Sequence, residues 1–210
     1  MRIEDLLNDA FSRHYRSWRK PSDLGEISCE ARQGYLRAVA RYENPPASIP
    51  SLEVHNDRLL ELGGNLFCLL PEVDWHLRRS IAHFGALHQY FEDLRALVED
   101  GRLLHCHFPV DVMDRFGVTA SDFSEGRWSY RADCAAFMSF WLDDYLPKLR
   151  QEAEEFMNMK RLPPSLATLR QACLRRHERI EGILRQSALG LEQLRPSSWP
   201  ASVGLDSVAA

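Results

Sequence analysis

The sequence predicts an all-α protein built as a helical bundle. Apolar residues recur through most of the 210-residue chain with the spacing of one helix face. The alternation of apolar and polar residues that marks half-buried strands is almost absent. Prolines divide the helical runs, most clearly in the segment NPPASIPS and at Leu162-Pro163-Pro164. Together these observations favour successive helices over a sheet.

The N-terminal part is predicted to contain two helices and one apolar segment. The first helix covers 3–19, and the second covers about 28–42 and stops at the proline-rich linker. The apolar segment 52–70 follows and carries the pair Gly63-Gly64 in its middle. Glycine inside a helix costs roughly 1 kcal/mol relative to alanine. The pair therefore indicates close packing or the close approach of a ligand.

The C-terminal part is predicted to contain three long helices. They cover 74–100, about 127–160 and 164–190, and 101–118 is expected to be irregular up to a turn at Phe116-Gly117. The tail from Pro196 is small and polar and is expected to be disordered. The predicted organisation is N-terminal helices and linker in 1–50, a helical core in 51–190 and a disordered tail in 191–210.

Composition and charge limit the function. Hydrophobic residues make up 45% of the chain and charged residues 27%, as in globular soluble proteins. The net charge of -4 argues against a nucleic-acid partner, which requires a surplus of Lys and Arg. No segment has the roughly 18 apolar residues of a transmembrane span. The five cysteines form no CxxC pair, so reduced thiols and a cytoplasmic location are expected.

The segment 85–118 carries the most specific pattern. It reads GALHQYFEDLRALVEDGRLLHCHFPVDVMDRFGV, with Gly85, Gln89 and Arg95 followed by acids, Pro109 and an RFGV turn. This segment resembles, without gaps, the second aspartate-rich region of squalene and phytoene synthases. Weaker similarity covers roughly 55–190. The resemblance implies a bundle like the C-terminal two-thirds of the isoprenoid synthase fold.

The resemblance also implies a site. Carboxylates on two facing helices of that family hold Mg²⁺ ions, which neutralise the diphosphate of an allylic prenyl substrate. The corresponding metal ligands here are Glu92, Glu99 and Asp100. The corresponding substrate-binding residues are Gln89, Arg95, Gly64 and Phe67, the last two from a helix that resembles a wall of the prenyl pocket. The alternative readings are a solvated acidic helix face and an internal hydrogen-bond network.

The chain departs from the family pattern at two places. Ala96 replaces the first aspartate of the second motif, and the first aspartate-rich motif has no counterpart in 1–50. The nearest substitute, His55-Asn56-Asp57 with Glu61, is too close in sequence to the second motif to form the opposite wall. Head-to-head coupling by this chain alone is therefore not expected.

Three further groups of residues carry weaker patterns. His105-Cys106-His107 has two metal-ligand types, but adjacent residues rarely converge on one zinc ion. Asp143-Asp144 lacks a third acid at suitable spacing and is expected to be a helix-surface pair. The aromatic residues Phe137, Phe140, Trp141 and Tyr145 are expected to belong to the core.

Three functional hypotheses follow. The first is an isoprenoid-pathway protein that binds or transforms a prenyl diphosphate or terpenoid ligand, with Mg²⁺ as the possible cofactor. In the second, a second copy of the chain or a full-length homologue supplies the missing acidic helix. The third is a non-catalytic partner or assembly protein built on the same fold.

Overall fold

A computed structural model of the chain describes residues 26–42, 48–70, 72–99, 108–119, 122 and 132–189. Every regular element in these ranges is a helix, which confirms the predicted all-α class. The elements are α2 Glu26–Tyr42, α3 Leu52–Leu59, η2 Leu60–Gly64, α4 Asn65–Cys68, α5 Trp75–Glu99, α6 Val110–Phe116, α8 Ala132–Ser139, η4 Phe140–Tyr145, α9 Leu146–Asn158 and α10 Pro164–Leu189.

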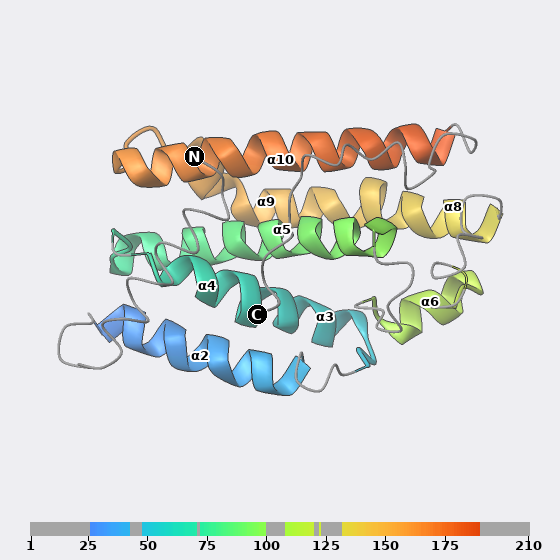
Figure 1. Ribbon diagram of the computed structural model, residues 1–210, viewed down its shortest axis with the longest axis horizontal. Coiled ribbons are helices and arrows are strands. Elements are labelled where there is room, and N and C mark those ends of the chain that lie inside the picture. Colours follow the sequence, from blue (N-terminus) through green and yellow to red (C-terminus); the bar gives the residue numbers. More distant parts are fainter. Residues whose placement is uncertain are drawn as a thin grey trace.

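The long helix α5 runs through the middle of the molecule (Figure 1). It makes its most extensive contacts with α9 and with η2. In the view of Figure 1, α9 and α10 lie on one side of α5, the continuous run α3–η2–α4 lies on the other, and α2 forms the outer edge beyond that run. α5 therefore presents different faces to α10 and to α3, and this arrangement positions the candidate site.

Local sequence explains where several helices begin and end. The Ser51 side chain accepts a hydrogen bond from the Val54 N–H at the start of α3. The Asp74 carboxylate accepts hydrogen bonds from the N–H groups of His76 and Leu77 and so caps α5. Gly117, with φ of 63°, ends α6 in the left-handed conformation that glycine adopts at little cost.

The glycine pair allows two helices to touch through their backbones. A Cβ atom added to Gly63 would lie 2.2 Å from the carbonyl oxygen of Gly85 on α5, and one added to Gly85 would lie 2.3 Å from that of Gly63. Gly64 lies beside Ala82 of the same helix. Of the two predicted reasons for the pair, close packing is the one observed. The π-helical turn η2 lies at this crossing.

Aromatic side chains fill the interior between α3, α5 and η4. Trp141 is completely buried, and the rings of Phe108, Phe137 and Tyr145 surround it at 5.0, 5.8 and 4.8 Å. The hydroxyl of the buried Tyr90 donates to the carbonyl of Trp141 at 2.7 Å. These residues form part of the main hydrophobic core, as expected for the aromatic cluster.

Several predicted boundaries differ from the structure. Residues 110–116, expected to be irregular, form α6. The predicted helix 127–160 is described from 132, and it contains the π-helical segment η4 ahead of α9. The predicted helix 3–19 and the tail 191–210 lie outside the described residues. No helix within the described ranges combines the length and the apolar character needed to cross a bilayer.

Candidate functional site

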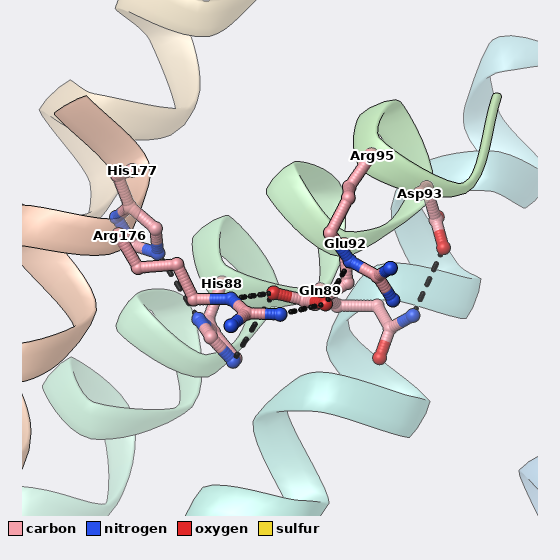
Figure 2. Close-up of polar contacts among 7 residues, drawn as sticks. All are labelled: His88, Gln89, Glu92, Asp93, Arg95, Arg176 and His177. Carbon is pink, nitrogen blue, oxygen red and sulfur yellow. Dashed lines mark hydrogen bonds and ion pairs between the residues drawn. The ribbon is translucent and has the colours of Figure 1, made fainter. Parts of the chain in front are cut away.

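The residues that match the acidic motif lie on α5, and Glu92 is their centre. Its two carboxylate oxygens accept hydrogen bonds from Arg176 of α10, from Nε at 2.5 Å and from Nη2 at 2.9 Å (Figure 2). Arg95, one turn further along α5, donates from Nε to Oε2 at 2.8 Å. Glu92 therefore lies between two guanidinium groups.

These contacts keep Glu92 ionised over almost the whole acidic range. Burial by itself would raise the pKa of the carboxyl group. The hydrogen bonds from Arg176, with the charges of His88, Arg176 and Arg95, outweigh burial and lower the pKa to about 2. Both oxygens are already occupied and two cationic groups adjoin them, so the contacts of Glu92 do not fit those of a Mg²⁺ ligand.

Asp93, the next residue of α5, faces α3 and not α10. It forms an ion pair with Arg58 of α3, with Nη1 at 2.5 Å from Oδ2, and both side chains are almost fully buried. Gln89 donates to Oδ1 of Asp93 at 2.9 Å. The predicted substrate-binding Gln89 and Arg95 thus each contact a carboxylate of α5 (Figure 2). Glu92 and Asp93 do not converge on a shared ligand, because their partners come from α10 and α3.

A buried histidine pair adjoins Glu92, and sequence analysis did not identify it. Nδ1 of His88 lies 3.1 Å from Nε2 of His177 on α10. The His177 ring stacks on Phe91 with centroids 4.3 Å apart. Burial, together with the charges of His88 and two arginines, lowers the pKa of His177 well below its ordinary value. The only sequence feature pointing here was the helical spacing that places His88 one turn before Glu92.

Arg58 is the other functional group that the sequence did not reveal. It lies within the apolar run that continues into the glycine pair, and its burial depends on a partner 35 positions later. A lone arginine in such a run is ordinarily a surface residue. Only the packing of α3 against α5 brings it to Asp93.

Gly64 and Phe67, predicted to line a prenyl pocket, lie at helix contacts. A Cβ atom added to Gly64 would lie 3.1 Å from the carbonyl oxygen of Ala82, closer than an ordinary van der Waals contact. Phe67 is completely buried and packs against Phe84 and His88, with ring centroids at 5.9 and 5.4 Å. Both residues belong to the packed interior between the run η2–α4 and α5.

The segment His55-Asn56-Asp57 and Glu61, the nearest substitute for the first acidic motif, do not form one site. His55 is buried among the aromatic rings of Phe108, Trp141 and Tyr145. Asn56 accepts a hydrogen bond from the Tyr145 hydroxyl. Glu61 lies 3.8 Å from Arg41 of α2, on the far side of the bundle from α10.

The remaining metal candidates are only partly described. Glu99 is the last residue of α5, but its side chain is not described, and Asp100 lies outside the described residues, as does the segment His105-Cys106-His107. Asp143 is exposed and pairs with Arg185 at 2.7 Å, as expected for a helix-surface acid. Among the described side chains, no group of three or more His, Cys, Asp or Glu is arranged to hold a metal ion.

Comparison of the chain with protein families, with curated proteins and with solved structures finds no match. The resemblance to squalene and phytoene synthases therefore rests on residues 85–118 and the weaker similarity around them, and it stays a prediction.

Proposed function

We propose that this chain is a non-catalytic partner or assembly protein that resembles squalene and phytoene synthases. In this proposal, the carboxylates of α5 stabilise the bundle instead of holding Mg²⁺. The chain would act in the isoprenoid pathway beside a catalytic protein, such as a full-length homologue that carries both aspartate-rich motifs.

The contact between Glu92 and Arg176 carries the proposal. The guanidinium of Arg176 and that of Arg95 lie where a metal ion would have to approach the carboxylate. A bidentate charge-assisted pair of this kind is among the stronger polar contacts in proteins. Displacing it with Mg²⁺ would require breaking hydrogen bonds to both oxygens and placing a dication beside two arginines.

A second candidate function is the binding of a prenyl or terpenoid ligand, with or without turnover. The gap-free match of residues 85–118 favours it, because Glu99 and Asp100 still occupy acidic positions of the motif. A homodimer or a homologue could supply the acidic helix that this chain lacks. In that case Mg²⁺ would be held mainly by Glu99, Asp100 and the carboxylates of the partner.

A thermal-shift series separates the two candidates. Farnesyl and geranylgeranyl diphosphate are added with Mg²⁺ or with EDTA to the wild type, to Glu92→Gln and to the double variant Glu99→Ala/Asp100→Ala. A ligand that binds only the native state raises the melting temperature in proportion to the logarithm of its excess. We expect no added stabilisation from Mg²⁺ in any of the three proteins, and a lower melting temperature for Glu92→Gln without ligand.

Two outcomes would count against the proposed function. A Mg²⁺-dependent shift that disappears in Glu99→Ala/Asp100→Ala would identify a diphosphate site at the end of α5. Prenyl products formed in the same samples by coupling, or by loss of diphosphate, would establish an enzyme.

A further inference from the structure

A polar cleft lies between α2 and the run η2–α4. Its volume is about 420 Å³, and the beginning of α5 contributes to its wall. This is within the range of pockets that hold small molecules. Every residue that lines it is charged or carries an amide, except Gly34. Such a lining suits a hydrated, charged ligand and not an apolar chain.

Three arginines from two helices give the cleft its charge. Arg37 and Arg41 come from α2, and Arg78 comes from α5. Two carboxylates, Glu30 and Glu61, face them, which leaves an excess of one positive charge in a chain of net charge -4. The cleft is therefore a locally basic site on an acidic protein.

The arginines differ in how far they are committed to protein partners. Arg78 lies 2.6 Å from Glu30, whereas Arg41 lies only at 3.8 Å from Glu61. Arg37 is exposed, and it forms no hydrogen bond or ion pair with any residue that the structure describes. None of the five N–H donors of the Arg37 guanidinium is therefore used by a described residue, which favours this side chain as the contact for a ligand in the cleft.

Neighbouring groups hold the cleft in shape. The guanidinium of Arg78 stacks on the Trp75 ring at 5.0 Å, and that of Arg41 stacks on the Tyr42 ring at 4.9 Å. Gly34 of α2 lies so close to Asn65 that an added Cβ would be 2.6 Å from its Nδ2 atom. Since that amide also donates to the carbonyl of Glu61 at 2.7 Å, the contact between α2 and α4 is fixed.

We propose that this cleft binds a small molecule carrying phosphate groups, with Arg37 as the principal contact and Arg41 and Arg78 as its neighbours. The planar guanidinium fork matches two phosphate oxygens at once. Several guanidinium groups spread over one cleft match the several oxygens of a phosphomonoester or diphosphate better than they match one carboxylate. Binding would need no metal, which separates this site from the acidic end of α5.

The test is a titration of the full-length chain with sodium pyrophosphate in EDTA, at ionic strength held constant with sodium chloride. Binding is followed by calorimetry and by thermal shift. We expect saturable binding to the wild type, weakened by about tenfold or more in Arg37→Ala through loss of a charge-assisted hydrogen-bonding group. Arg79→Ala is the matched control, because Arg79 is an exposed arginine next to Arg78 on α5 and does not line the cleft.

Three results would overturn the assignment: no saturable binding to the wild type, an unchanged affinity in Arg37→Ala, or an equal loss in Arg79→Ala. Melting temperatures without ligand show whether each variant is folded, and the exposed position of Arg37 makes its replacement mild.

Geranylgeranyl diphosphate distinguishes a prenyl diphosphate from free phosphate as the ligand. Tighter binding than pyrophosphate in EDTA supports a prenyl diphosphate, and equal binding supports free phosphate. Because this titration is done without Mg²⁺, a lack of pyrophosphate binding would not contradict the proposed function. Likewise, a Mg²⁺-dependent shift that contradicts the proposed function would not contradict the metal-free cleft.

Discussion

Guanidinium groups hold both carboxylates at the centre of α5, but in different surroundings. The pair Arg58–Asp93 is almost fully buried, whereas Glu92 with its two arginines is partly accessible. A buried ion pair adds little net stability relative to an apolar replacement, but loss of one partner leaves an uncompensated charge. The two carboxylates are therefore expected to respond differently to substitution and to pH.

Replacement of one member of the buried pair should be costly. We expect Arg58→Met to lower the free energy of unfolding by about 3–5 kcal/mol, because it leaves the buried carboxyl group of Asp93 without its main partner. The double variant Arg58→Met/Asp93→Leu should lose less than the single one. Urea denaturation measures both, with the exposed Asp144→Asn as a control expected to change stability by less than about 0.5 kcal/mol. A mild effect of Arg58→Met would contradict the assigned burial.

Stability should fall with acid in two separate pH ranges. His177 is buried in its neutral form, with a pKa well below the ordinary 6.5. The unfolded chain therefore binds more protons, and the contribution of His177 is complete above pH 6.5 and decreases as the pH falls below that value. Glu92 has a pKa of about 2 against an ordinary 4.5, so its contribution is complete above 4.5 and is lost between 4.5 and about 2.

Variants assign the two ranges. Chemical denaturation from pH 7.5 to pH 3 should show a smaller pH dependence near pH 6 for His177→Phe, and near pH 4 for Glu92→Gln. Because His88 adjoins both Glu92 and His177, each variant should have its main effect in its own range and a smaller effect in the other. An identical profile for His177→Phe and the wild type would show that the histidine pair does not control the upper range.

At the scale of the elements, one backbone contact fixes how α5 crosses η2. Gly63 and Gly85 face each other with no space for a side chain on either. We expect Gly63→Ala to destabilise the protein by about 1–3 kcal/mol through overpacking, since the nearest atom is a backbone oxygen that cannot rotate away. Gly182→Ala in α10 is the control, because an added Cβ there meets nothing within 4 Å and should stabilise the helix by about 0.5–1 kcal/mol. Thermal unfolding compares them; equal effects would exclude the close approach.

At the scale of the whole molecule, the described residues form one large core and one small one. The large core surrounds α5, whereas Ala38, Tyr42, Ile49 and Leu62 form a separate cluster under α2. Local opening requires less free energy where fewer apolar contacts are lost. Native-state hydrogen exchange should therefore be slowest for amides of 84–94 in α5 and fastest, among the described helices, for those of α2. Exchange of both helices in one step would show a single cooperative unit.

The architecture also separates Glu92 from the proposed phosphate-binding cleft. The Arg176 contact of Glu92 lies between α5 and α10, whereas α2, the run η2–α4 and the start of α5 line the cleft. Neither Glu92 nor Arg176 lines the cleft, so a ligand there would not contact them. Substitutions at Arg37 and at Glu92 are therefore expected to have independent effects, the first on phosphate binding and the second on stability without ligand.

The amino-acid sequence by itself determined the all-α class, the proline breaks and the position of most helices. These features depend on periodicity and on local backbone preferences, which a linear pattern contains. It did not predict α6, because seven residues are too few for a clear helical period. Helical periodicity also placed the aromatic residues of 137–145 in the core.

The tertiary structure alone decided what the polar residues of α5 do. Glu92 binds an arginine 84 positions away, Asp93 one 35 positions away, and His88 a histidine 89 positions away. Acids at helical spacing look alike whether they face solvent, a metal ion or a guanidinium group. Their partners are chosen by which helices pack against each face, and that is a property of the folded bundle.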